Sequence, residues 1–430
     1  MKRIFFLFLT FALLGSLCAC GKTQAELPAP AAVEIVSTPQ PMAEVLGADP
    51  SAPGSITIYA PDAKASWTTL GQLYASKTGI AVGLTDRADE ADLLCADYAA
   101  LVSRADRTAD LGESAAYALL NTPAYACKNA VGSVVGLPLS LEAVAVGVNT
   151  ELLEKAGYTM EGLDGFKALH RFSVSVDDRK GELGFSSWAP MALADGSGQK
   201  LTRYLFDLPA YAEWLENGSF TGKYVDHQLL HRPTFYYRTL FSTMLDLGTK
   251  KGKDVNTVTD AEALAAFAGG EALFCLVDSR ELDTLSSLGM DLSKLDFVPA
   301  WMGIPGEMDW GFVADATTYA AVIANEATRR HNAEDFLYWC LCDGEAKAVL
   351  AETYDGLPYE GFTCRNTLLR KNAENNGKGL VPVPWLHRQV ADPDAWDSYF
   401  LAQLRYITPD NVTWRWQVMT AELVKRWNGK

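Results

Sequence analysis

The chain has 430 residues, 49% of them hydrophobic and 21% charged, which is enough apolar material for about two or three globular domains. Its 37 basic and 53 acidic side chains give a net charge of −16. Such an acidic surface repels phosphate backbones, so we expect no nucleic-acid partner.

The first twenty residues have the layout of an export signal. Lys2 and Arg3 precede an apolar stretch, Ile4–Leu17, which is too short to span a bilayer comfortably. The Leu-Cys-Ala-Cys-Gly that ends it resembles the lipobox of bacterial lipoproteins. This resemblance implies a signal peptide at 1–19, lipidation of Cys20 and an exported protein anchored to the outer face of the cell membrane. The alternative is an ordinary cleaved signal with incidental cysteines.

Residues 20–54 are expected to form the lipidated cysteine and a tether. Six prolines are interleaved with Ala, Ser, Thr and Glu between residues 21 and 54, and little hydrophobic periodicity remains. Pro-rich stretches of this kind are extended, semi-rigid spacers. We therefore expect the folded part to begin at about Ser55.

Strands and helices alternate in the next segment. Strands are predicted at 56–59, 80–84 and 91–95, and a helix that Ser66 can cap runs between the first two and stops at Gly79. This order predicts a mainly parallel sheet with helices on both faces. Ligands of such sheets bind outside the carboxyl ends of the strands. The candidates for one wall of such a crevice are Tyr59, Asp62, Lys64, Trp67, Asp97 and Tyr98.

A single carboxylate interrupts the next predicted strand. Residues 137–148 are almost wholly apolar, yet Glu142 lies in their middle. An ionised carboxylate that is buried without a partner is very unfavourable. Glu142 therefore faces either a ligand cleft or a buried Lys or Arg. The strand leads into a helix that Asn149 or Thr150 can cap.

The rest of the chain is mostly helical. Residues 165–250 are rich in aromatic side chains, and Thr259 with Glu262 forms a capping box that opens a helix. A strand at 272–277 then leads to Asp278 and Arg280. Further helices are predicted at about 333–342, 344–352, 392–405 and 411–427.

The sequence contains no familiar catalytic motif. HExxH, GxSxG, a complete P-loop and an EF-hand loop are all missing. His227 and His231 are spaced i, i+4, but without a third ligand nearby they are interpreted as surface residues. We expect no catalytic residues, metal or cofactor, and hence no enzyme. Three cysteines in apolar runs, Cys95, Cys275 and Cys340, are predicted to be buried free thiols.

Three tryptophans near predicted loops or strand ends, Trp67, Trp188 and Trp310, are candidates for stacking on sugar rings. Ordinary core packing is the alternative for each of them.

Four stretches in order, within residues 55–366, resemble the extracellular solute-binding proteins of bacterial ABC importers. The similarity is to the carbohydrate-binding, maltose-binding-protein-like group. The stretches are ITIYAPDAKASWTTLGQLYASKTGIAV, GLPLSLEAVAVGVNTELLEKAGY, ALAAFAGGEALFCLVDSRELD and NAEDFLYWCLCDGEAKAVLAETYDGLP.

The resemblance implies two α/β lobes, each a mainly parallel sheet flanked by helices, with a ligand cleft between them. Crossovers are expected near 138–142, 275–280 and 315–320. The N-terminal lobe would then hold 55–140 plus 278–317, and the C-terminal lobe 141–277 plus 318–430. A monomer of this kind captures a sugar or oligosaccharide by hinge closure and delivers it to the permease of an ABC importer.

The resemblance also implies where ligand binds. Glu142 matches a sugar-contacting glutamate, and Asp278 and Arg280 stand where the family often has Gly-Pro-Trp. With the first wall, the ligand-binding set is completed by Glu142, Trp188, Asp278, Arg280 and Trp310. Two alternatives keep the fold: a non-sugar solute such as a polyamine, or a surface sensor without a transporter.

Overall fold

The structure, a computed structural model, describes residues 54–129, 131–194, 198–216, 243–299, 301–303, 306–323, 326–389, 392–406, 418, 421–422 and 425–426. They belong to one compact unit that runs from Ala48 to Lys430. The signal segment, Cys20 and all of the expected tether before Gly54 lie outside the described residues. So do His227, His231 and most of the expected helix at 411–427.

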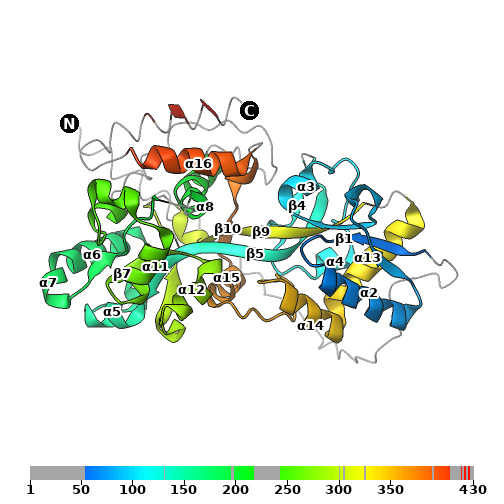
Figure 1. The fold of residues 1–430 in the computed structure, drawn as a ribbon, viewed down its shortest axis with the longest axis horizontal. Coiled ribbons are helices and arrows are strands. Elements are labelled where there is room, and N and C mark those ends of the chain that lie inside the picture. The colour runs from blue at the N-terminus through cyan, green and yellow to red at the C-terminus, as the bar shows by residue number, and fades with distance from the viewer. Residues whose placement is uncertain are drawn as a thin grey trace, which may run out of the picture. The chain divides into compact units, whose positions relative to one another are not determined.

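The described part is built around one ten-stranded sheet with the order β2-β1-β3-β9-β5-β7-β6, to which β4, β8 and β10 add further pairings (Figure 1). The outer strands pair in parallel, β1 with β2 and β3, and β6 with β7. The long strands β5 and β9 are antiparallel to each other. The strands are β1 (Ile56–Tyr59), β2 (Val82–Leu84), β3 (Leu93–Ala96), β4 (Cys127–Lys128), β5 (Val134–Asn149), β6 (Ser186–Trp188), β7 (Ala272–Asp278), β8 (Leu295–Val298), β9 (Trp310–Val322) and β10 (Val381–Val383).

Helices surround this mixed sheet, which gives the α/β class expected from the sequence. They are α2 (Lys64–Thr78), α3 (Tyr98–Val102), α4 (Ala115–Ala118), α5 (Thr150–Lys155), α6 (Phe166–Asp178), α7 (Lys180–Leu183), α8 (Gly198–Thr202), α9 (Leu208–Glu216), α11 (Asp260–Ala268), α12 (Leu282–Ser287), α13 (Ala327–Cys342), α14 (Gly344–Thr353), α15 (Thr367–Gly377) and α16 (Pro393–Leu404). A π-helical turn, Arg203–Asp207, joins α8 to α9.

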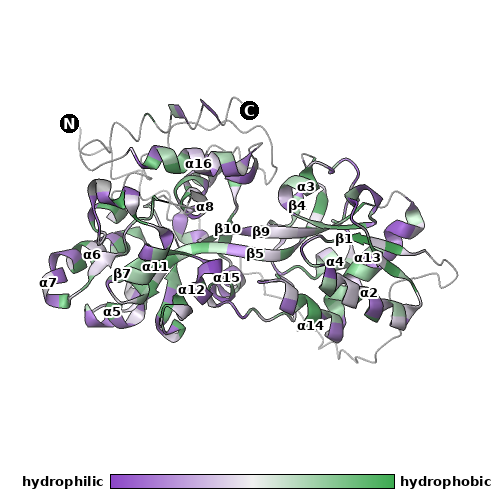
Figure 2. Cartoon of the chain, viewed as in Figure 1, coloured by the Kyte–Doolittle hydropathy of each residue, from purple (hydrophilic) through white to green (hydrophobic). Residues whose placement is uncertain are grey.

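The side chains of β5 alternate between two hydrophobic cores because successive residues of a strand point to opposite faces. Val144 and Val146 pack in one core with Trp188 and Tyr204. The residues between them in sequence, such as Ala145, pack in the other core. Figure 2 shows this hydrophobic stretch of β5 and the hydrophilic residues of α7 and α15. Glu142 continues the row of even-numbered positions, so its face of the sheet is fixed by the register.

Local sequence patterns correctly predicted where two helices begin. Thr259 and Glu262 form the predicted capping box at the start of α11. Asn149 caps α5, and its side chain accepts a hydrogen bond from the backbone of Leu152. The cap predicted at Ser66 is wrong, since α2 begins at Lys64.

The three cysteines predicted to be buried free thiols are confirmed. Cys95, Cys275 and Cys340 are buried, and each of the six cysteines in the described residues is free.

Three segments connect the β1 end of the sheet (β1, β2, β3) with its β7 end (β6, β7, β8). Two are β5 and β9, which contain the crossovers expected at 138–142 and 315–320. The third is the connection 354–366, which leaves α14 beside α2 and enters α15 against β5, β8 and β10.

The structure differs from expectation at 275–280. After β7 the chain turns into α12, which packs on α11, and β8 then pairs with the same end of β5 as β7 does. Conversely, α13 and α14 pack near β1 and α2. The lobe boundaries stay a prediction, but these contacts favour placing 282–298 at the β7 end and 327–353 at the β1 end.

Candidate ligand-binding site

Glu142 lies at the centre of β5, directly opposite Asp315 of β9. Its carboxylate Oε2 is 2.9 Å from a guanidinium nitrogen of Arg203. The Glu142 side chain retains 15% of its exposure and that of Arg203 only 5%. Glu142 therefore has the buried arginine partner that was one of the two alternatives for it, and a small part of its side chain still reaches solvent.

Arg203 is held from three sides. The same guanidinium nitrogen donates to Asp278 Oδ2 at 2.9 Å, and the guanidinium lies 3.5 Å from the ring centre of Trp385. Arg203 begins the π-helical turn, a local widening of the helix that is frequent at functional sites.

Asp278 and Arg280 complete this cluster. Asp278 caps the short turn after β7, and its carboxylate accepts two hydrogen bonds from the Arg280 side chain at 3.0 and 3.1 Å. Arg280 Nε is also 3.3 Å from Glu142 Oε2. Because the Arg280 side chain is 52% exposed, the cluster presents it and Glu142 to solvent, with Arg203 and Asp278 behind them.

A second ion pair lies on the same face of the two central strands. Arg388 Nη2 is 2.9 Å from Asp315 Oδ2, and its guanidinium lies 4.4 Å from the ring centre of Tyr98. The backbone N–H of Trp385 donates to Asp315 Oδ2 at 3.0 Å. The segment 385–388 is thus fixed to β9 and to α3, which carries Tyr98.

The π-helical turn also binds this segment through its last residue. Asp207 accepts a hydrogen bond from the backbone N–H of His387 at 2.8 Å, and its second oxygen is 2.5 Å from His387 Nδ1. Arg203 and Asp207 together attach the turn to the central strands and to the 385–388 segment.

Burial shapes the electrostatics of the cluster. It raises the pKa of Glu142, although the nearby Arg203 charge opposes this. It likewise raises the pKa values of Asp207 and Asp315 against the opposing effects of His387 and Arg388. These carboxylates hold protons more tightly than exposed ones, which is the behaviour of partly desolvated groups.

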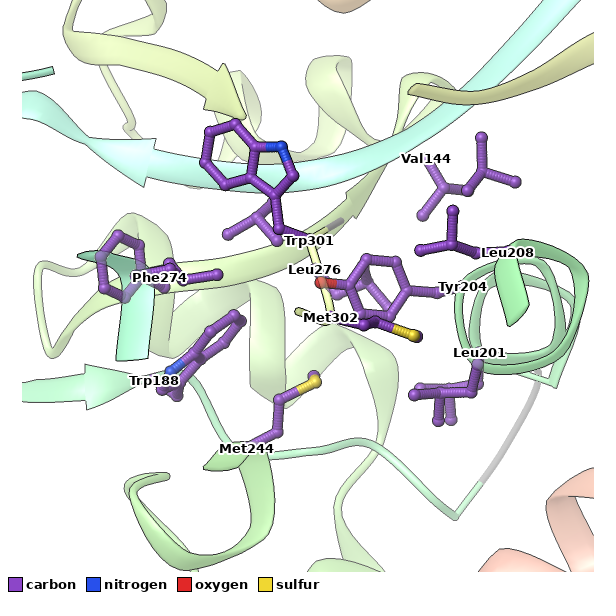
Figure 3. Close-up of a cluster of buried hydrophobic side chains, with 14 of the residues drawn as sticks. Val144, Trp188, Leu201, Tyr204, Leu208, Met244, Phe274, Leu276, Trp301 and Met302 are labelled. Carbon is purple, nitrogen blue, oxygen red and sulfur yellow. The ribbon is translucent and has the colours of Figure 1, made fainter. Parts of the chain in front are cut away.

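Two predicted aromatic ligand contacts are instead core residues. Trp188 is fully buried, packs against Phe274 (Figure 3), and donates a hydrogen bond from its indole nitrogen to Ser173 Oγ at 2.9 Å. Trp67 is also fully buried and donates to Tyr354 Oη at 2.8 Å. Both tryptophan rings are therefore packed in cores, which was the alternative to stacking on a sugar ring.

Trp310 is 8% exposed, and its ring meets Tyr211 edge-on at 5.5 Å. It belongs to the same core as Trp188.

The remaining candidates of the first wall do not join the cluster directly. Lys64 pairs with Asp86 on the surface, and Asp97 is used as the cap of α3. Asp62 is exposed, and Tyr59 is half-buried against a hydrophobic core. Tyr98 is the wall residue that the structure ties to the central strands, through Arg388.

Sequence reasoning missed Arg203, Asp207 and Arg388. Asp315 could have been found in the same way as Glu142, because it is a lone carboxylate in the largely apolar stretch GFVADATTYAAV. Arg203 had no comparable signal because its helix is rich in aromatic residues and its partners are distant in sequence.

Within the described residues, no group of three or more His, Cys, Asp or Glu side chains is arranged so that it could hold a metal ion. None of the helices in those ranges combines the length and apolar character that crossing a bilayer requires.

The fold is similar to that of several solved structures. RafE from Streptococcus pneumoniae matches 87% of this chain and 97% of its own, with a TM-score of 0.63 and 14% identity. The bacterial solute receptor AcbH matches 87% of this chain and all of its own, with a TM-score of 0.63 and 15% identity. A de novo designed cysteine esterase gives a TM-score of 0.64 at 14% identity, covering 88% of this chain and 98% of its own.

No protein-family model matches the chain, and no curated protein matches its sequence. The structural matches show that the chain has the two-lobed fold of extracellular solute-binding proteins. At these identities the likeness defines the fold alone, and the designed esterase is a reminder that one fold can host different functions.

Proposed function

We propose that the protein is an exported, lipid-anchored solute-binding protein. It captures a sugar or oligosaccharide by closure of its two lobes and delivers it to the membrane subunits of an ABC importer. In this account Cys20 carries the lipid and residues 21–54 are the tether. Ligand binding selects a closed state that is less populated without ligand, so no covalent chemistry is needed.

One observation carries the proposal. Glu142 lies in the middle of the connecting strand β5, and Arg280 lies beside it in the turn after β7. Both side chains reach solvent, with their partners Arg203 and Asp278 buried behind them. A carboxylate and a guanidinium held in this way can accept from and donate to ligand hydroxyls. Support comes from neighbours of the same fold, since RafE has been solved with raffinose and AcbH prefers β-D-galactopyranose.

A thermal-shift screen of mono- and oligosaccharides on the whole protein tests the proposal. A ligand at 100 times its Kd stabilises the folded state by about 2.7 kcal/mol, which raises Tm measurably. The screen should find at least one such sugar. No shift across a broad panel, raffinose and galactose included, would count against a sugar ligand.

A cationic solute is the second candidate because of how Arg203 is held. Its guanidinium lies between the Glu142 and Asp278 carboxylates and against the Trp385 ring, which is a site suited to a cation. A solute of this class would have to replace Arg203. Binding of spermidine that weakens steeply with salt, without any sugar response, would support this candidate instead.

A further inference from the structure

The turn that carries Asp278 and Arg280 is closed from behind by a glutamate. Glu281 is the last residue of this turn, and its Oε2 accepts a hydrogen bond from the backbone N–H of Asp278 at 2.8 Å. The Asp278 carboxylate accepts in return from the backbone N–H of Arg280 at 3.0 Å. These bonds belong to a capping box, so the position of the Glu281 carboxyl group fixes the start of the turn.

Lys200 of α8 holds the other oxygen of Glu281. Its Nζ is 2.7 Å from Glu281 Oε1 and 2.7 Å from Asp260 Oδ1, at the start of α11. The Lys200 side chain is only 7% exposed, and a buried ammonium is stable only where it is paired. Lys200 therefore joins three parts of the β7 end of the sheet, which are α8, α11 and the turn after β7.

Water cannot readily replace Lys200 at this contact. The cavity beside the lysine has a volume of about 20 Å³, which is room for about one water molecule. Met191 and Leu276 contribute to its largely apolar wall. Among the described residues that line it, only Lys200 and Asp260 are charged. Loss of the ammonium would therefore leave Glu281 Oε1 without its donor.

One helical segment grips the turn at both of its ends. Lys200 and Arg203 are three positions apart, in α8 and in the π-helical turn that continues it. Lys200 contacts Glu281, the last residue of the turn. Arg203 donates to Asp278 Oδ2, at the start of the turn, at 2.9 Å. Arg280 lies between these two points, so the place of its exposed guanidinium depends on both contacts.

We propose that Lys200 is a positioning residue of the ligand site. Being buried, it does not touch the ligand, but through Glu281 it holds the turn so that Arg280 Nε lies 3.3 Å from Glu142 Oε2. This role depends on the proposed function, because the turn matters for binding only if a ligand occupies the site. The positioning itself is measured on the protein without any sugar, so it can fail while sugar binding is confirmed, and the reverse.

The test is the rate at which phenylglyoxal modifies Arg280, followed by peptide mass spectrometry in the unaltered protein and in Lys200→Met. A guanidinium released from Asp278 reacts faster than one that donates two hydrogen bonds to it. We expect modification about fivefold faster in Lys200→Met, the change that corresponds to one net hydrogen bond. Arg329 is the internal control, since it is 41% exposed and pairs with the buried Asp92 at 2.8 Å.

Arg329 should react at the same rate in both proteins. Lys180→Met is the matched variant, because that lysine is 49% exposed and pairs with Asp177 at 3.1 Å, and it should leave Arg280 unchanged. An unchanged rate for Arg280 in Lys200→Met, or equal acceleration of Arg280 and Arg329, would overturn the proposal.

Glu281→Met tests whether Lys200 acts through Glu281. This variant should also accelerate Arg280, and adding Lys200→Met to it should give little further change, since both substitutions remove the same contact. Lys200→Met should fold, because burial raises the pKa of Glu281 to about 8 and the carboxyl group can keep its proton once the ammonium is gone. If it does not fold, Glu281→Met decides alone. Unchanged Arg280 reactivity in that variant, or accelerations that multiply in the double variant, would contradict the positioning role.

Discussion

The guanidinium of Arg203 lies 3.5 Å from the ring centre of Trp385, residues that are 182 positions apart in the sequence. On its other sides the same group pairs with Glu142 of β5 and Asp278 of β7. One arginine of the π-helical turn thus contacts two strands of the sheet and the segment after β10. Several consequences of this arrangement can be measured.

Arg203→Met should destabilise the protein strongly. The substitution leaves the buried Asp278 carboxylate without one of its two arginine partners, and breaking a buried pair in this way typically costs about 3–5 kcal/mol. The free energy of unfolding from urea titration checks this. Arg280→Met is the control, because that side chain is half-exposed and its loss should cost about 1 kcal/mol or less. Equal losses would contradict the central role given to Arg203.

Glu281 ends the short turn after β7, and its carboxylate Oε1 is 2.7 Å from Lys200 Nζ. Because of this largely buried glutamate, the free energy of unfolding should fall as pH rises through the neutral range. Burial raises the pKa of Glu281 from 4.5 to about 8, although the nearby Lys200 opposes the shift. Between these values the folded protein retains a proton that the unfolded chain has released, so the pH dependence of stability is negative.

Glu281→Gln should flatten the part of the pH profile that Glu281 contributes, because the amide does not titrate. Urea midpoints measured from pH 4.5 to 8 for both proteins would show this. An identical slope in the variant would remove Glu281 as the cause.

Trp188→Phe should affect stability but not ligand binding. The substitution removes the hydrogen bond to Ser173 and leaves a small cavity beside Phe274, at a cost of about 1–3 kcal/mol. Thermal unfolding gives the loss, and the Kd of any sugar found in the screen should stay within about twofold. Weaker sugar binding with unchanged stability would return Trp188 to the ligand site.

Cys20→Ser should abolish lipid attachment if the lipobox interpretation is correct. Incorporation of labelled palmitate in a bacterial host measures the attachment. Cys18→Ser is the matched control, since that cysteine lies two residues before the expected lipid site and should leave labelling unchanged. Labelling lost with Cys18→Ser but kept with Cys20→Ser would reverse the assignment.

The order of strands and helices was predictable because hydrophobic periodicity and helix caps are local signals. The strand containing Glu142 and the capping box at Thr259 were both found in this way. The crossover expected near 275–280 was misplaced because nothing local distinguishes a strand that crosses from one that turns back into α12.

The candidate site was predicted in part for the same reason. Glu142 was visible as a charge in an apolar strand, but its partner Arg203 lies 61 residues away on a helix without a distinguishing pattern. Trp67 and Trp188 look like ligand contacts in sequence because loops flank them, yet both rings point into cores. Side-chain direction depends on tertiary packing, which one sequence does not reveal.

The most direct test of the account is the affinity of the intact protein for the sugar found in the thermal-shift screen, measured by isothermal titration calorimetry beside Glu142→Gln. Glu154→Gln, an exposed glutamate of α5, serves as the matched control. We expect one ligand per chain, binding at least about tenfold weaker in Glu142→Gln (about 1.4 kcal/mol) and unchanged in the control. Equal affinity in all three proteins, or no heat with any sugar, would contradict a sugar site at Glu142.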